Sequence, residues 1–346
     1  MTRKFKNHKN QLKNLLYIGN KLFEHGITPT TIETLGPLLE EEGFKVWYSS
    51  SQKNQLLRFV AMLWSVFRHR KVDYVLIDTY STKNFWYAFA TSQLCRLLGL
   101  KYIPILHGGN LSFRLKKNRK ICKMIFKNSF QNVAPSLFLV EQFKVFGYEN
   151  LNHIPNAIEL ENYPFLERKK ASPHLLWVRS FAKIYNPIMA IDVFALLKKK
   201  YPEATLCMIG PEKDGSLLET KQRAAALNVD VNFTGKLSKQ DWIDLSKQYS
   251  IFINTTHFDN MPVSVIEAMS LGLAVVSTTV GGIPFLVENE KEALLVPDND
   301  VDKMVKAIVR LIESPKLFDE ITSSARAKTQ QFKWEDVKLQ WLNILK

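Results

Sequence analysis

The amino-acid sequence predicts an α/β protein of two doubly wound domains, each with a parallel sheet between layers of helices. Short apolar runs of strand length alternate with longer amphipathic runs of helix length, which is typical of this fold class. The alternation restarts after a polar linker at residues 161–174, and a chain of 346 residues is long enough for two domains. We therefore expect one domain at 1–165, a second at 166–330 and a final helical segment at 331–346.

The first domain is predicted to contain five strands and a further strand-like segment. The strand segments are short, apolar and rich in Val, Ile, Leu and Tyr, whereas the helical segments are amphipathic and Gly43 ends the first of them. The strands are expected at 15–19, 45–49, 74–79, 102–107, 131–136 and 151–158, and the helices at 30–43, 55–70 and 84–99.

The second domain repeats this pattern without repeating the sequence. Ligands of doubly wound sheets bind beyond the carboxyl ends of the strands, so we expect a cleft between the domains that both sheets face. The strands are expected at 175–180, 204–210, 231–235, 251–256, 274–279 and 293–297, and the helices at 188–202, 215–229, 238–248, 262–272, 301–332 and 334–346.

Most of the positive charge lies in the first domain. Residues 1–165 hold 23 Lys and Arg against 11 Asp and Glu, whereas residues 166–346 hold 24 against 22. The densest cluster, at 113–128, interleaves seven cations with apolar residues. It indicates either a solvated helix face or a surface for an anionic partner. No nucleic-acid-binding motif accompanies it, so we favour an anionic membrane surface and expect no nucleic acid.

The sequence also predicts the compartment. Cys95, Cys122 and Cys207 have neither a paired nor a metal-binding spacing, which favours reduced core residues of a cytosolic protein. The basic N-terminal stretch lacks an apolar run of signal-peptide length, and no segment approaches the ~18 apolar residues that span a bilayer. We expect a cytoplasmic protein that is at most peripheral on the inner face of the membrane.

The clearest candidate site follows the strand at 251–256. Asn260 suits a helix N-cap, Pro262 suits a first turn and Gly272 suits a helix end. The helix is therefore expected to begin near Met261, with free backbone N–H groups and the positive end of its dipole. Such a helix start binds phosphate.

Two acids, Asp259 and Glu267, lie on either side of this helix start. Asp259 precedes the first turn, and Glu267 lies about five or six residues into the helix, roughly 8–9 Å along its axis. Two acceptors flanking a phosphate seat fit a nucleotide sugar. The alternative is that Asp259 caps the helix and Glu267 is solvated. However, Glu267 stands in apolar surroundings, where a buried acid requires a hydroxylated or cationic partner.

Residues 259–300, which begin DNMPVSVIEAMSLG, resemble the signature of glycosyltransferase family four. That signature has two acids with seven residues between them, then A-M-x-x-G, a V-V strand and G-G-x-P, all present here. The similarity extends more weakly to the domain junction and to His107. It implies the GT-B fold of two Rossmann-like domains, retention of anomeric configuration and a last helix that crosses back onto the first domain.

The resemblance implies a role for each residue of the donor site. Glu267 would accept hydrogen bonds from the donor ribose. Asp259 would hold hydroxyls of the transferred sugar, although the family more often has the longer Glu there. The phosphates would be bound by the backbone N–H groups of Asn260, Met261 and Val263.

Further candidates lie at other strand ends. His107 would face the donor sugar near the reacting carbon; the alternative is a histidine satisfied within its own loop. Gly19 and Asn20 are expected in a loop that approaches phosphate or acceptor. Arg179 suits a bidentate phosphate ligand. Lys183 is a weaker candidate for the diphosphate, because it lies one position short of the family's lysine.

The resemblance therefore predicts a metal-independent hexosyltransferase with a nucleotide-sugar donor, no cofactor and a lipid-linked or oligosaccharide acceptor. Helix N–H groups and Arg179 can stabilise the departing diphosphate electrostatically. We expect a role in cell-surface polysaccharide or glycolipid biosynthesis. Two alternatives stay open: a GT-B-fold epimerase or phosphorylase, and a non-catalytic nucleotide-sugar-binding protein. The sequence does not specify the base, the sugar, the acceptor or the linkage.

Overall fold

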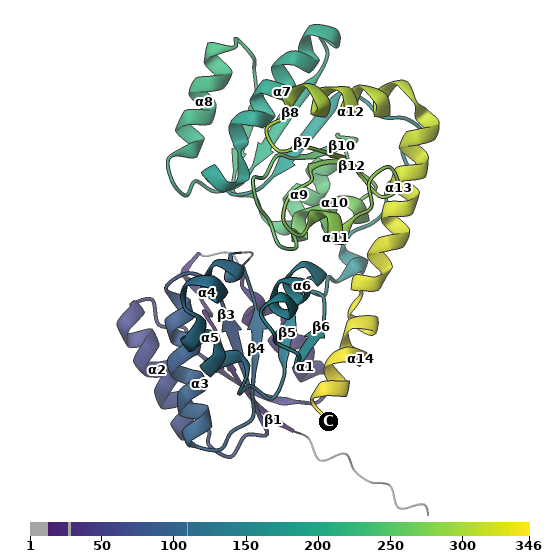
Figure 1. Ribbon diagram of the computed structural model, residues 1–346. Coiled ribbons are helices and arrows are strands. Elements are labelled where there is room, and N and C mark those ends of the chain that lie inside the picture. The colour runs from purple at the N-terminus through teal and green to yellow at the C-terminus, as the bar shows by residue number, and fades with distance from the viewer. Residues whose placement is uncertain (1–12, 27–28, 109) are drawn as a thin grey trace, which may run out of the picture. The chain divides into compact units, whose positions relative to one another are not determined.

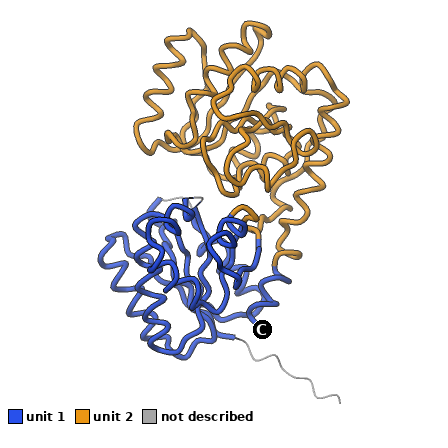
Figure 2. Tube along the Cα trace, viewed as in Figure 1, with its two compact units in different colours: residues 1–135, 139–154, 338–346 blue, residues 136–138, 155–337 orange. Residues whose placement is uncertain are grey.

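The chain folds into two compact units, which Figure 2 colours separately. The computed structural model describes residues 13–26, 29–108 and 110–346, so the basic N-terminal stretch lies outside the described residues. Unit 1 comprises the described residues up to Pro135, then Leu139–Ile154 and Lys338–Lys346; unit 2 comprises Ser136–Phe138 and Pro155–Val337.

The chain passes from unit 1 to unit 2 after Ile154. The sequence predicts this boundary later, at the polar linker. Ile158, Leu160 and Tyr163 are buried in the apolar core of unit 2. Residues that the sequence assigns to the end of the first domain therefore belong to the second unit, because their apolar side chains are held there.

Unit 1 is built on a six-stranded parallel sheet with the strand order β2-β1-β3-β4-β5-β6 (Figure 1). Every strand that the sequence predicts is present: β2 and β3 have the predicted bounds, β1 is displaced by one residue, β4 ends one residue earlier, and β5 and β6 are shorter than predicted. The strands are β1 (Asn14–Ile18), β2 (Lys45–Ser49), β3 (Tyr74–Thr79), β4 (Tyr102–Leu106), β5 (Asn132–Ala134) and β6 (Leu151–His153).

Helices cover the sheet of unit 1. α2 and α3 pack on it through a core that includes Leu16, Ile77, Met62 and Cys95. The cation-rich cluster at 113–128 forms two short helices, and a helix that the sequence reading did not predict follows β5. The helices are α1 (Thr31–Glu41), α2 (Gln55–Arg68), α3 (Asn84–Leu97), α4 (Leu111–Lys117), α5 (Arg119–Phe126) and α6 (Leu137–Val145).

Unit 2 has its own six-stranded parallel sheet with the order β12-β11-β10-β7-β8-β9. Its buried strands read as continuous apolar runs, as expected of a parallel sheet covered on both faces. The strands are β7 (His174–Val178), β8 (Thr205–Ile209), β9 (Asn232–Gly235), β10 (Ile251–Asn254), β11 (Ala274–Thr278) and β12 (Leu294–Val296).

The helices of unit 2 agree with the prediction except at two places. The expected segment 301–332 is two helices, because Ser314 caps a new helix that has Pro315 in its first turn. A short helix also follows β11. The helices are α7 (Pro187–Lys200), α8 (Ser216–Ala226), α9 (Lys239–Ser246), α10 (Val263–Ser270), α11 (Ile283–Leu286), α12 (Val301–Glu313) and α13 (Pro315–Thr329).

Each sheet has a topological switch point, where the strand order changes direction. In unit 1 it lies between β1 and β3, and in unit 2 between β7 and β10. Ligands of open α/β sheets bind at the carboxyl ends of the strands that flank such a point. The residues that follow these four strands are therefore the first to consider for a site.

The chain ends in unit 1. The last helix, α14 (Trp334–Ile344), buries Trp341, and Leu345 is buried just after it. The Tyr74 hydroxyl donates a 2.8 Å hydrogen bond to the Lys346 carbonyl oxygen. The last residues are thus part of the unit that contains the N-terminal sheet.

The burial of the three cysteines agrees with their prediction as core residues. Cys95, Cys122 and Cys207 are buried and free of disulfides. Within the described ranges, no helix is both long and apolar enough to cross a bilayer.

Replacing Trp341 by Ala should destabilise the protein by about 3 kcal/mol, because it leaves a cavity around a nearly buried indole. Chemical denaturation monitored by circular dichroism measures the change. Leu339→Ala on the same helix is the control, since Leu339 is 62% exposed and should change stability by less than about 0.5 kcal/mol. Equal effects of the two substitutions would contradict the packing of α14.

Candidate active site

An ion pair of largely buried side chains, 16% and 14% exposed, lies at the switch point of unit 2. Arg179 follows β7 and Asp259 follows β10, and the Arg179 guanidinium pairs with Asp259 Oδ2. The guanidinium also lies over the Tyr185 ring, 4.6 Å from its centroid. Burial lowers the pKa of Arg179, whereas the nearby Tyr185 and Glu267 act in the opposite direction. The pair joins the ends of two neighbouring strands.

The two glycines of the signature allow the next loop to pack directly against this one. The Gly282 N–H donates a 2.8 Å hydrogen bond to the Asp259 carbonyl oxygen. A Cβ on Gly281 would lie 2.1 Å from that same oxygen, and one on Gly282 would lie 1.7 Å from the Asn260 carbonyl oxygen. Any side chain at either position would displace the loop that carries Asp259.

α10 begins at Val263, two residues later than the sequence predicts, and Asn260 does not cap it. The Asn260 side-chain oxygen instead accepts a hydrogen bond from the Ser136 hydroxyl. The Asn260 N–H is also engaged, since it donates to Asp259 Oδ1 at 2.8 Å. The expected cap is thus wrong, because Ser136 holds the side-chain oxygen of Asn260 and the neighbouring Asp259 holds its N–H.

The start of α10 nevertheless has free hydrogen-bond donors. Among the described residues, none accepts a hydrogen bond from the backbone N–H groups of Met261, Val263 or Ser264. The Ser264 hydroxyl is also buried without a partner. The Met261 side chain is packed in the core, which fixes the loop. Free donors at a helix N-terminus form an anion site.

Glu267 is buried on α10 and has both kinds of partner that burial requires. Its Oε1 accepts a 2.7 Å hydrogen bond from the Tyr163 hydroxyl and contacts the Lys239 ammonium. Burial, reinforced by the negative charge of Glu267, raises the pKa of Tyr163. No described residue donates to Glu267 Oε2. One carboxylate oxygen is therefore held while the other can accept a further hydrogen bond.

Lys183 contacts none of the site residues Arg179, Asp259 and Glu267. Its ammonium lies 3.3 Å from Glu219 Oε1 at an exposed position. Its backbone N–H donates a 2.9 Å hydrogen bond to Asp214 Oδ2. Its assignment to the diphosphate stays a prediction, and the geometry gives that prediction no support.

In unit 1, His107 is held by a buried carboxylate. His107 Nε2 lies 2.9 Å from Asp78 Oδ1, and the Tyr17 hydroxyl donates to the same oxygen at 3.1 Å. The Tyr80 ring stacks on the imidazole, with 5.0 Å between ring centroids. Because Asp78 Oδ1 can only accept, a neutral His107 carries its proton on Nε2 and presents Nδ1 as an acceptor.

The loop after β1 meets the same carboxylate. A Cβ on Gly19 would lie 2.6 Å from Asp78 Oδ2, so only glycine lets the loop pass so closely. Asn20 is fixed by the Arg58 guanidinium, which donates to Asn20 Oδ1 at 3.0 Å. Gly19, Asn20 and Asp78 line a cavity of about 10 Å³, room for about one water. The two predicted strand ends thus converge at the switch point of unit 1.

The aspartates of DNDVD at 298–302 have the Asp-x-Asp spacing that occurs at metal sites. The predicted absence of a metal therefore depends on what these aspartates contact. Asp298 lies 2.9 Å from His257 Nδ1, and Asp300 caps α12 by accepting from the Lys303 N–H. In the part of the chain that the structure describes, no three His, Cys, Asp or Glu side chains form a metal-type cluster. Metal independence itself stays a prediction.

Four residues of these groups are missed by sequence reasoning. Ser264 could have been noticed, because it follows the proline at the helix start. Asp78 also had a signal, as the acid in a fully buried strand. Tyr163 and Lys239 had none, since they reach Glu267 from segments 104 and 28 residues away.

The comparisons with known proteins agree with this geometry. Residues 161–328 match the family model "Glycosyl transferases group 1". An uncharacterized glycosyltransferase of Haemophilus influenzae is 28% identical over 279 residues, which are 79% of this chain and 70% of that protein. The UDP-Gal:alpha-D-GlcNAc-diphosphoundecaprenol alpha-1,3-galactosyltransferase of Escherichia coli is 22% identical over 75% of this chain and 71% of its own length.

The fold is shared with solved structures. The Anabaena Alr3699/HepE structure in complex with UDP and glucose has a TM-score of 0.78 at 17% identity, covering 96% of this chain and 99% of that one. The predicted GT-B fold is thereby confirmed. The two relatives described above are named as glycosyltransferases, and not as an epimerase, a phosphorylase or a non-catalytic binding protein. Because residues 161–328 resemble the group 1 glycosyl transferases and the relatives that span most of the chain are glycosyltransferases, the protein is a glycosyltransferase.

Proposed function

We propose that the protein transfers a sugar from a UDP-sugar to an acceptor hydroxyl with retention of anomeric configuration. The observation that carries this proposal is the group of unpartnered donors at the start of α10, next to the Arg179–Asp259 pair. Backbone N–H groups, a buried hydroxyl and a guanidinium together match the negative charge of a diphosphate.

The two acids then bind the parts of the donor on either side of the diphosphate. Glu267 Oε2 accepts a hydrogen bond from the ribose, while Tyr163 and Lys239 hold Oε1. Asp259 orients Arg179 and accepts from hydroxyls of the sugar. Uridine is the proposed base, because the Anabaena structure binds UDP and the E. coli relative is named for a UDP-sugar.

Transfer breaks the bond between the anomeric carbon and the phosphate oxygen and forms one to the acceptor oxygen on the same face of the sugar. The charge that develops on the diphosphate is stabilised by the donors of α10 and by Arg179. The acceptor proton passes to the departing phosphate. In this scheme Asp259 and Glu267 position the donor and exchange no proton. Lys183 is not assigned a contact.

His107 contributes as a hydrogen-bond acceptor. Asp78 holds its Nε2, so Nδ1 accepts from a hydroxyl of the donor sugar. Asp78 is then a positioning residue that acts through His107. Gly19 makes room for this carboxylate, and Asn20 extends the loop toward the acceptor.

The proposed acceptor is a lipid-linked glycan at the cytoplasmic face of a membrane, within cell-surface polysaccharide or glycolipid biosynthesis. The diphosphoundecaprenol acceptor named for the E. coli relative supports this class. The cations of α4 and α5 supply a surface for anionic headgroups, since Lys116, Lys117 and Lys120 are all exposed.

Ser264→Ala should weaken UDP binding about tenfold, because a hydrogen bond to a charged phosphate is lost. Ser270→Ala is the matched control on α10, since its hydroxyl already donates to the Ile266 carbonyl at 2.8 Å. Isothermal titration with UDP measures both affinities. An unchanged affinity for Ser264→Ala would remove this hydroxyl from the phosphate site.

Asp78→Asn should lower kcat about tenfold or more with little change in the KM for the donor. The amide can donate to Nε2, which moves the imidazole proton to Nδ1 and removes the acceptor. Steady-state kinetics measure the split, and nitrogen NMR of His107 reports the tautomer. In a His107→Ala background the Asp78 substitution should have no further effect; additive losses would refute the coupling. Asp73→Asn, at an exposed position just before β3, is the control.

Sugar transfer is expected to need no metal ion and to retain the anomeric configuration. Prolonged EDTA treatment should leave the transfer rate from UDP-glucose or UDP-galactose unchanged, because protein donors and Arg179 supply the stabilisation. Proton NMR of the product should show the anomeric configuration of the donor. Loss of activity in EDTA that Mg²⁺ or Mn²⁺ restores would overturn metal independence, and an inverted product would overturn retention.

A further inference from the structure

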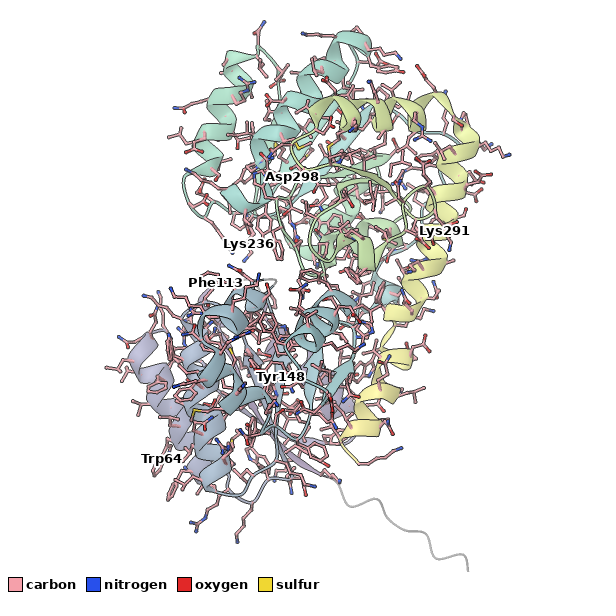
Figure 3. All side chains as sticks on the ribbon, in the orientation of Figure 1. Trp64, Phe113, Tyr148, Lys236, Lys291 and Asp298 are labelled. Carbon is pink, nitrogen blue, oxygen red and sulfur yellow. The ribbon has the colours of Figure 1, made fainter. Side chains whose placement is uncertain are left out.

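α2 exposes an apolar surface that the described residues of its own unit do not cover. Leu56, Leu57, Val60, Trp64 and Phe67 are 70%, 57%, 55%, 60% and 48% exposed. At about 100° per residue, these five positions fall within an arc of about 100° on one side of the helix. We call them the α2 stripe. Figure 3 shows Trp64 on the outer side of this helix.

The opposite side of α2 is the one that packs on the sheet. Arg58, Met62 and Val66 are buried there, so the helix does not need the stripe for its own packing. A continuous exposed apolar surface of this kind marks an interaction site.

The charges around the stripe are of one sign. From Ser49 to Val72 the sequence contains no Asp or Glu. Lys53 precedes the helix, while Arg68 and Arg70 follow the stripe, and the Arg70 guanidinium lies 5.7 Å from the centroid of the Phe67 ring. Two copies of this surface would bring cations against cations. An apolar surface bordered by cations suits the interface of an anionic bilayer, where Trp is also favoured.

The neighbouring helices extend the cationic surface. α3 contacts both α2 and α5, so the three helices form one layer (Figure 1). In that layer α5 exposes Lys120 and Lys123, and α3 exposes Trp86, at 44%. The apolar stripe and the cations of α5 therefore belong to the same helical layer of unit 1.

We propose that the α2 stripe inserts into the headgroup region of an anionic membrane, with Arg68 and Arg70 bound to lipid phosphates. The cations of α4 and α5 add long-range attraction, and the stripe anchors the protein. This inference rests on the proposed function and names the surface that would hold the protein at the membrane that carries its acceptor. It is tested without donor or acceptor, so its failure would leave the proposed transfer reaction standing.

The test is flotation of the full-length protein with vesicles of phosphatidylcholine, with and without phosphatidylglycerol. The wild type should float with the anionic vesicles. The double variant Val60→Gln, Trp64→Gln should bind them about tenfold or more weakly, because it removes apolar area that the membrane buries. Leu218→Gln is the matched control: Leu218 lies in unit 2 and is 64% exposed. It should bind like the wild type, and circular dichroism should show all variants folded.

A charge variant and a spectroscopic probe separate insertion from simple attraction. Arg68→Gln with Arg70→Gln should reduce the preference for anionic vesicles and its dependence on salt. Brominated lipids should quench tryptophan fluorescence in the wild type and less in Trp64→Phe, which places Trp64 in the lipid.

Three outcomes would overturn the proposal. The wild type could fail to float with anionic vesicles. Charge reversal at Lys116, Lys117 and Lys120 could abolish binding while the Val60, Trp64 variant binds normally, which would assign binding to the basic helices alone. Finally, the stripe variants could change the oligomeric state and not flotation, which would make the stripe an interface between copies.

Discussion

The ion pair between Arg179 and Asp259 is the interaction on which the donor site depends. It joins the ends of β7 and β10 at the one place in the sheet of unit 2 where neighbouring strands lead away in opposite directions. Removing one partner of a buried pair leaves an uncompensated charge, at a cost of about 3–5 kcal/mol. The loop from Asp259 to Pro262 is thereby fixed at one end, while Gly281 and Gly282 pack against its backbone. The unpartnered N–H groups of α10 keep their direction because this loop cannot relax around them.

The fold could be predicted because its evidence is local. A parallel sheet covered on both faces requires continuous apolar strands, and runs such as YVLIDT and IFINTT can be recognised without knowing their neighbours. The boundaries were less predictable. The linker was predicted from its polar composition. However, Ile158 just before it and Tyr163 within it are core residues of unit 2. The break between α12 and α13 was signalled by Ser314 and Pro315, but the surrounding helical periodicity is continuous across them.

For the candidate site, the sequence could indicate residues that carry a motif or follow a strand, and not the distant partners that hold them. Asp259 and Glu267 were found because one helix and one loop fix their spacing. Asn260 was assigned to a cap from propensity, but a tertiary contact with Ser136 holds its side-chain oxygen instead. Lys239 could not be found, because its contact with Glu267 exists only after α9 and α10 have packed. The same holds for the His107–Asp78 contact, which brings together two different strands.

Arg58 ties the start of α2 to the loop after β1. Its guanidinium donates to the Gln52 and Lys53 carbonyls and to Asn20 Oδ1, so the residues before the helix, the helix itself and the loop after β1 are held as one body. Asn20 is therefore linked to α2 directly, through one side chain, and not only through the sheet. Replacement of Arg58 by Met would keep apolar packing at the start of the helix and would release Asn20 from it.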